Sequence, residues 1–526
     1  MPQVDSSPGA ASAPKSLERS VGRPELFGTV FVTGAVVMTV EIVGTRVIGP
    51  VFGVGLFVWS ALLAVTLASL ATGYYAGGVV ADRKLEPKLL GRVVAGAGVL
   101  LGVTPLLSQS VLRAAEALGT RAGPLLGAGI LFAPTLLALG MTGPIAVKLA
   151  TKSMAGAGRG IGSVYAVSTA GSLAGTLLVG FVLIPALDAQ AILAWAAVVL
   201  ILLGGLSLAF RRQPLALGLL LCPLFVGGGS STPLPPGLSI VDKSQSLLGL
   251  VEVILDENRG VRLLRSDHSI LGATFERGGS SAFGFVNVLE AVRFLRPEAK
   301  TCLNIGLGTG AVPSALGRQG IKVDVVEIDP AVVRFTEKYF DFSATGDVYI
   351  EDARAFLQRT ERRYDIVVHD TFTGGTTPEH LLSLQVLQRV HAILRPGGVF
   401  ALNFVGYYEG TDAEASLAVA RTVRAAFRHV RAYRDSAPDP AHPLGNIIFF
   451  ASDSPLQFTV PSGTRFESEI TEGLVKGTAA WPVLEHIPEG QLITDARNPL
   501  ARLQLPIAEK HSVAMNELLP LEVWLN

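Results

Sequence analysis

Six long apolar segments, all before residue 211, decide what the first half of this chain can fold into. They lie at about 26–48, 56–80, 91–107, 124–147, 164–186 and 189–210. A helix needs about 20 mostly apolar residues to cross the hydrocarbon core of a bilayer. Charged residues make up 16% of the whole chain, below the ~25% usual for soluble domains. We therefore predict a membrane α-helical bundle of six to seven spans over residues 25–228, with the lipid bilayer as its partner.

Two features of this half leave alternatives open. The apolar stretch 214–228 is short for a seventh span, since it has about 15 residues. Glu41 and Arg46 lie within or near the end of the first segment, where charged side chains are costly and need a partner or a cavity. We expect their partners on other helices, in a structural ion pair, although a polar site inside the bundle would use the same residues.

The remaining chain divides by composition. Residues 1–24 are rich in Pro, Ser, Ala and Gly and predict a disordered tail. Residues 229–238 belong to a Gly, Ser and Pro-rich stretch that reads as a linker. Alternating apolar residues at 250–254 and 261–264 predict short antiparallel strands in a small β-subdomain, residues 239–275. Residues 461–526 form a C-terminal extension.

Residues 276–460 carry the pattern of an α/β domain. Apolar strands are expected at 302–305, 323–329, 348–350, 364–370 and 399–404, with helices between them. Continuous apolar strands that alternate with helices are typical of a doubly wound, mainly parallel sheet. We therefore predict a Rossmann-like domain behind the small β-subdomain.

A glycine loop follows the first of these strands and carries Gly306, Gly308, Thr309 and Gly310. Such a loop allows a tight turn and a close approach of the backbone to a ligand. The third spaced glycine of the dinucleotide fingerprint is missing, because position 311 is Ala. The loop therefore favours a nucleoside without a pyrophosphate over NAD.

Three acids stand where the next strands end. Glu327 closes the second strand and could accept both ribose hydroxyls, Asp352 follows the third and could hold an adenine edge, and Asp370 ends the fourth. Each acid alone could be a helix cap or a solvated acid. The glycine loop and the three acids, in this order along the chain, together indicate a nucleoside-binding site. Lys plus Arg and Asp plus Glu both number 43, and this balance gives no reason to expect nucleic acid as a partner.

The order of these motifs resembles the spermidine synthase family of aminopropyltransferases, within the class I methyltransferase-like fold. The resemblance covers about 240–455, and with the apolar half the chain is similar to bacterial membrane-fused spermidine synthase-like proteins. It is carried by residues 305–310, 326–329, 351–353, 365–370 and 394–398. It implies that the donor is bound by Gly306, Gly308, Thr309, Gly310, Glu327, Asp329, Asp352 and Ala353.

The implied reaction belongs to polyamine biosynthesis: transfer of propylamine from decarboxylated S-adenosylmethionine to putrescine or a related amine. Asp370 would be the base that takes the proton of the attacking amine. The resemblance implies neither a metal nor a prosthetic group, and it leaves a homodimer open. Because such a donor is made inside cells, we expect a multi-pass protein of the cell membrane with a cytoplasmic catalytic domain. The basic residues of the tail and of the loops near 83–92, 148–159 and 211–212 would then lie on the same side.

Four departures from the family pattern affect the acceptor. Thr309 replaces an Asp in the glycine loop, Leu248-Gly249 replaces a Tyr-Gln pair, Phe283-Gly284-Phe285 replaces Tyr-His-Glu, and Thr373 replaces a second acid. These changes keep two alternatives in view. One is an S-adenosylmethionine-dependent methyltransferase that acts on a membrane-associated acceptor, and the other is a ligand-binding transporter or sensor.

Overall fold

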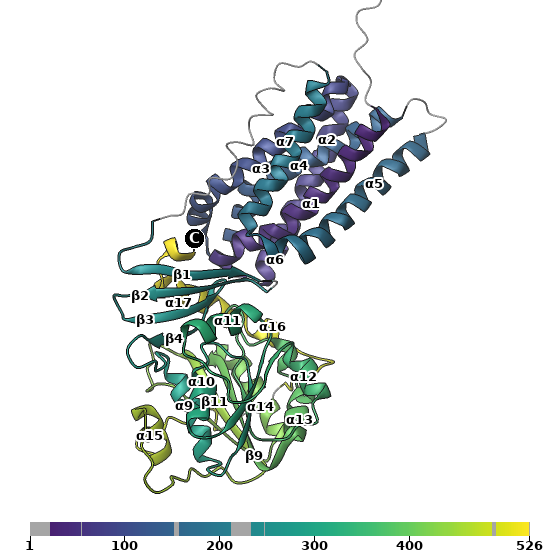
Figure 1. The fold of residues 1–526 in the computed structure, drawn as a ribbon. Helices are drawn as coiled ribbons and strands as arrows, with labels where there is room; N and C mark the ends of the chain where they lie inside the picture. The colour runs from purple at the N-terminus through teal and green to yellow at the C-terminus, as the bar shows by residue number, and fades with distance from the viewer. Residues whose placement is uncertain are drawn as a thin grey trace, which may run out of the picture.

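The computed structural model describes residues 22–53, 55–151, 157–211, 233–246, 248–485 and 491–524. A helical bundle, a small sheet and a larger sheet covered by helices follow one another along the molecule (Figure 1). Most of the predicted tail 1–24, the stretch 214–228 and part of the linker 229–238 lie outside the described residues.

Six of the described helices are long and apolar enough to cross a membrane, by length and composition. Each of the six apolar segments found in the sequence forms one of these helices. The fifth segment continues from α5 through a π-helical turn at Val179–Leu183 into α6. The bundle consists of α1 (Arg23–Phe52), α2 (Leu56–Arg83), α3 (Pro87–Glu116), α4 (Gly119–Ala150), α5 (Ala157–Leu178), α6 (Ile184–Ala186) and α7 (Ala189–Ala209).

One end of the bundle is the basic end. There the start of α1 meets the end of α7, where Arg211 Nη1 donates to Glu25 Oε1 at 2.8 Å. The end of α4 meets the end of α2 at the same level, through an ion pair between Lys148 and Asp82. Most of the basic residues noted in the sequence that the structure describes lie at or beside these helix ends, among them Arg83, Lys84, Lys88 and Arg159.

The soluble half packs on the opposite end of the bundle (Figure 1). His268 Nδ1 lies 2.9 Å from the Pro50 carbonyl oxygen near the end of α1, and Asn516 Nδ2 donates to Glu116 Oε1 at the end of α3 at 2.7 Å. The expectation that the basic loops and the soluble half share one side is therefore wrong. The sequence argument counted six crossings before the soluble half, but the described residues on either side of 212–232 lie at opposite ends of the bundle.

The small sheet lies between the bundle and the larger domain. It is antiparallel, in the order β1-β2-β3-β4. Because side chains alternate along a strand, one face packs into the bundle core with Ile254 and Leu263, and the other joins the core of the larger domain with Val253 and Leu264. Its strands are β1 (Leu238–Gln245), β2 (Leu250–Asp256), β3 (Val261–Ser266) and β4 (Ser269–Phe275).

The larger sheet has seven strands in the order β10-β11-β9-β8-β5-β6-β7. Strands β5 to β9 are parallel, and β11 runs antiparallel to β9 and β10. The strands are β5 (Thr301–Ile305), β6 (Lys322–Glu327), β7 (Val348–Ile350), β8 (Tyr364–His369), β9 (Leu394–Tyr407), β10 (His429–Arg434) and β11 (Leu444–Ser452). The predicted doubly wound domain is thus confirmed, and its strand order reverses between β5 and β8, where such folds bind ligands.

Two groups of helices cover this sheet, one on each face. The first is α9 (Gly284–Glu290), α10 (Ala311–Arg318) and α11 (Pro330–Tyr339), and the second is α12 (Ala353–Arg359), α13 (Leu384–Ile393) and α14 (Glu414–Ala426). The strands are therefore buried on both sides, which explains their continuous apolar sequences.

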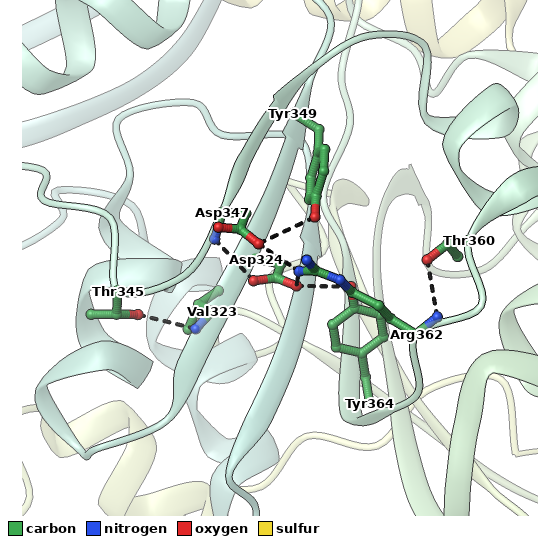
Figure 2. A network of polar contacts seen from close by, with 8 residues as sticks. All are labelled: Val323, Asp324, Thr345, Asp347, Tyr349, Thr360, Arg362 and Tyr364. Atoms are coloured by element: carbon green, nitrogen blue, oxygen red, sulfur yellow. Dashed lines mark hydrogen bonds and ion pairs between the residues drawn. The ribbon is translucent and has the colours of Figure 1, made fainter.

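A polar network around Asp324 joins three segments of the larger domain (Figure 2). The buried Asp324 carboxylate accepts hydrogen bonds from Arg362 Nη1 at 2.8 Å, Tyr364 Oη at 2.9 Å and the Asp347 amide at 3.0 Å. A buried carboxylate is tolerated when it is paired in this way. The network joins β6, the approach to β7 and the start of β8, and so has a structural role.

The C-terminal extension returns to the bundle. It contains α15 (Glu469–Lys476), α16 (Leu500–Leu503), α17 (Leu505–Leu518) and α18 (Leu521–Trp524). Arg265 in β3 donates to the Val523 carbonyl oxygen at 2.7 Å and lies over the Trp524 ring at 5.0 Å. Its guanidinium also pairs with Glu252 at 2.6 Å, with both side chains fully buried. The bundle, the small sheet and the extension therefore meet in one interface, called the seam below.

Candidate functional site

The glycine loop connects β5 to α10 in the left-handed region of backbone space. The φ angles are 87° at Gly306, 53° at Gly308 and 71° at Gly310, values that side chains with a β-carbon rarely adopt. A β-carbon at position 306 would lie 2.1 Å from the Asp370 carbonyl oxygen. Glycine is required there because the loop packs directly on the backbone of the expected base.

Glu327 holds this loop from the neighbouring strand. Its carboxylate accepts hydrogen bonds from the amides of Leu307 and Asp329, both at 2.9 Å. Burial raises the pKa of Glu327, and these two hydrogen bonds oppose the rise. Each carboxylate oxygen can accept more than one hydrogen bond, so the two ribose hydroxyls expected from the sequence could still donate to it.

The structure places the other expected donor-binding residues at helix starts. Asp329 caps α11 by accepting from the Ala331 amide at 2.8 Å and receives a second hydrogen bond from Ser246 Oγ at 2.7 Å. Asp352 caps α12, whose first residue is Ala353, and its second oxygen lies 2.9 Å from His380 Nε2. Asp329 thus lies beside the loop and Glu327. Both oxygens of Asp352 already have protein partners, and its contact with an adenine edge stays a prediction.

The surroundings of Asp352 at the start of α12 favour the charged form of its carboxyl group. Burial tends to raise its pKa, but hydrogen bonds from the Ala355 amide and His380 outweigh that effect, and the pKa lies below its usual value.

Thr309 faces the small sheet. Its side chain is buried, and a β-carbon on Gly272 of β4 would lie 2.7 Å from Thr309 Cγ2. Strand β4 therefore covers the glycine loop on the side where the family pattern has an acid.

Asp370 lies at the carboxyl end of β8, at the point where the strand order reverses. Its amide donates to the Ile305 carbonyl oxygen at 2.9 Å, and its Oδ1 accepts from Asn403 Nδ2 at 2.9 Å. Burial raises the pKa of Asp370 to about 6, and the hydrogen bond from Asn403 limits the rise. A carboxylate with a pKa near neutrality suits general base catalysis.

Three polar atoms around this position have no hydrogen-bond partner within the described part of the chain. They are Asn304 Oδ1, Thr371 Oγ1 and Asn403 Oδ1, all buried. An unpaired buried polar group costs about 1–3 kcal/mol, and several beside one carboxylate indicate a place for a polar ligand. We did not identify Asn304 or Asn403 from the sequence, although each is an amide inside an otherwise apolar strand.

The structure places two of the segments at which the sequence departs from the family pattern. Gly249 lies against Asp267, so closely that a β-carbon at position 249 would be 2.3 Å from Asp267 Oδ2. Phe283 and Phe285 stack with ring centroids 6.0 Å apart. A glycine and two aromatic rings thus occupy these positions.

The charge of Arg46, in the first long helix, affects a carboxyl group of the soluble half. Burial raises the pKa of Asp267, and the positive charges of Arg46 and Arg265 oppose that rise. The charge of Arg46 thus interacts with a carboxylate group of the small sheet, and its expected partner on another bundle helix stays a prediction.

Comparison with known proteins identifies the domain that carries this site. Residues 288–451 match the spermine/spermidine synthase domain family. This domain is spermidine synthase-like. The resemblance inferred from the motifs is confirmed, and the matched range contains the glycine loop, Glu327 and Asp370. The bundle and the small sheet lie outside it.

Two curated relatives and one solved structure illustrate the range of this spermidine synthase-like group. The N-terminal histidine N-methyltransferase of Emericella nidulans is 31% identical over 326 residues, which cover 55% of this chain and 58% of that protein. The polyamine aminopropyltransferase of Vibrio vulnificus is 35% identical over 128 residues, which cover 23% of this chain and 43% of that protein. The chain thus spans about half the length of these relatives. A probable spermidine synthase from Corynebacterium glutamicum aligns with a TM-score of 0.39 at 18% identity, over 50% of this chain and 100% of that structure.

Proposed function

We propose that the spermidine synthase-like domain is an aminopropyltransferase that transfers propylamine from decarboxylated S-adenosylmethionine to putrescine or a related amine. The observation that carries this proposal is the position of Asp370, a carboxylate with a raised pKa fixed against the glycine loop. The family match and the Vibrio aminopropyltransferase support the same chemistry.

The reaction needs an acceptor nitrogen, a sulfonium donor and a base. The amine nitrogen attacks the carbon next to the sulfonium, so a C–N bond forms while the C–S bond breaks. The electron pair of the broken bond goes to sulfur, which leaves as neutral methylthioadenosine. The proton lost by the nitrogen goes to Asp370, whose hydrogen bond from Asn403 orients the carboxylate. The loop and Glu327 would hold the adenosyl part of the donor.

Methyl transfer from S-adenosylmethionine is the second candidate. Thr309 stands where an acid would meet the amine of a decarboxylated donor, and β4 packs on it. The Emericella methyltransferase also aligns over 326 residues, against 128 for the Vibrio aminopropyltransferase. In this case the product is S-adenosylhomocysteine, and Asp370 would have the same role toward the acceptor.

Mass spectrometry separates these candidates. The full chain, in lipid nanodiscs, is incubated with each donor in turn and with putrescine. Methylthioadenosine and a propylamine-extended amine are the products expected from the first proposal. Methylation of an acceptor with S-adenosylhomocysteine supports the second. Donor binding without turnover in either reaction would contradict both, and would favour a transporter or sensor.

We also propose that the bundle makes this a multi-pass membrane protein. Basic loops tend to be cytoplasmic, and the soluble half lies at the other end of the bundle. The charge distribution therefore no longer supports a cytoplasmic catalytic domain. The charge distribution favours a catalytic domain on the side of the membrane opposite the cytoplasm. A donor made inside the cell would then have to cross the membrane to reach it.

A further inference from the structure

A cavity of about 80 Å³ lies in the seam, apart from the donor-binding loop. This volume exceeds the space needed for one water molecule several times over, and it suits the end of a slender chain. The bundle and the soluble half both supply its walls, which include Phe52, Phe57, His268, Gly374, Ala508 and His511.

The walls combine apolar surface with polar groups, of which Glu509 is an acid that pairs with Arg121 at 2.9 Å. Burial lowers the pKa of His268 and of His511 to about 4, so both imidazoles are neutral near pH 7. His268 Nε2 lies 3.3 Å from Ser512 Oγ, and His511 Nε2 lies 3.4 Å from Ser269 Oγ. An apolar chain can lie against the aromatic and aliphatic walls beside these two neutral imidazoles.

Two short segments of the chain lead from the walls of the cavity to the reacting groups. Gly374 lines the cavity and follows Asp370 by four residues, a separation of at most about 14 Å. Phe372, between them, makes an edge contact with the ring of His511 at 5.3 Å. On the other side, β4 runs from Ser269 at the seam to Gly272 against Thr309, about 10 Å along the strand.

We propose that this seam cavity binds the apolar chain of the acceptor, while the acceptor amine reaches Asp370. The acceptor is then a long-chain amine. It would enter the seam from the bilayer around the bundle. The inference rests on the proposed transfer to an amine and names its substrate class. It accounts for the departures from the family pattern at 249, 283–285 and 373, because a chain without a second amine needs no groups to hold one.

Ala508→Phe tests the cavity directly. Ala508 lies on α17 and lines the space, so a phenyl ring there would fill it. Ala514→Phe is the matched control, because Ala514 is exposed on the same helix and does not line the cavity. Transfer to dodecylamine and to putrescine is measured by mass spectrometry with the full chain in nanodiscs, using each donor. Binding of methylthioadenosine reports on the donor site.

We expect dodecylamine to be the better acceptor, and Ala508→Phe to lower its kcat/KM by roughly tenfold or more. Ala508→Phe should leave putrescine turnover and methylthioadenosine binding unchanged. Ala514→Phe should leave all three measured quantities unchanged. A preference for putrescine, or an Ala508→Phe effect equal for both amines, would overturn the proposal.

A second measurement does not depend on turnover. A dodecylamine with a diazirine at the end of its chain should crosslink to residues 52–58 or 505–512, and Ala508→Phe should abolish that crosslink. If the crosslink forms but neither donor reacts, the proposed reaction fails and the cavity assignment stands. Crosslinks confined to lipid-facing helix surfaces would refute the cavity assignment itself.

Discussion

The α-carbon of Gly306 packs so closely on the Asp370 carbonyl that a β-carbon at position 306 would lie 2.1 Å from that oxygen. The two residues directly follow neighbouring strands, β5 and β8, which pair in parallel up to Ile305 and His369. The loop expected to hold the donor and the carboxylate expected to act as base are therefore a single packed unit. A shift of one moves the other.

Gly306→Ala should impair both donor binding and turnover. The added methyl group has to displace the Asp370 backbone, and the φ angle of 87° adds backbone strain. Gly320→Ala is the control, because Gly320 has a φ of 80° with open space around it and so carries the strain alone. We expect Gly320→Ala to cost about 1 kcal/mol of stability with normal kinetics. Equal kinetic effects of the two variants would show that the contact with Asp370 is unimportant.

The pH dependence of the reaction should report on Asp370. Its pKa is raised to about 6, and the base must be ionised to accept a proton. Therefore kcat/KM should fall as the pH drops below about 6. For stability the sign is opposite: a carboxyl whose pKa is raised on folding makes the folded state less stable once the pH rises above its unfolded pKa.

Removing the hydrogen bond from Asn403 should move this limb. Because that bond lowers the pKa of Asp370, Asn403→Leu should shift the acidic limb to higher pH. Asn446→Leu is a matched control, since the Asn446 amide donates to a different carboxylate, Asp435, at 3.2 Å. A limb that stays in place in Asn403→Leu, or moves equally in both variants, would assign it to another group.

The buried pair of Glu252 and Arg265 should stabilise the seam. Glu252→Gln leaves the Arg265 charge without its partner in a fully buried position, a change that typically costs about 3–5 kcal/mol. The exposed pair of Arg318 and Glu467 offers the comparison, because Glu467→Gln should cost below about 1 kcal/mol. Thermal unfolding of both variants in the same detergent measures the difference. A loss in Glu252→Gln as small as in Glu467→Gln would contradict a structural role for the pair.

The arrangement of the two halves can be tested with reporter fusions. The loop after α2 begins at the basic end of the bundle, whereas the soluble half lies at the other end. Fusions after Lys84 and after Asn526 should therefore report opposite sides of the membrane. By the charge rule, the fusion after Lys84 reads as cytoplasmic. Reporters on the same side would contradict the structure.

The sequence predicted the elements better than their mutual placement. The apolar segments and the run from the glycine loop to Asp370 could be read from hydropathy and periodicity, because each signal is local. Asn403 could not be assigned a role, since its partner lies on another strand and the pairing of β8 with β9 is not encoded in nearby residues. The charge interaction of Arg46 with Asp267 was missed for the same reason: it depends on how two halves far apart in sequence pack together.

The most direct test of the account is the rate of donor cleavage by Asp370→Asn. The account predicts that methylthioadenosine formation from decarboxylated S-adenosylmethionine and an amine falls by about 10²–10⁴-fold, while methylthioadenosine still binds with unchanged affinity. Asp365→Asn is the control, because Asp365 lies at the other end of β8, where it accepts from the Lys300 and Thr301 amides, and its variant should keep the rate. Turnover by Asp370→Asn at the rate of the unaltered chain would contradict the assignment of Asp370 as the base.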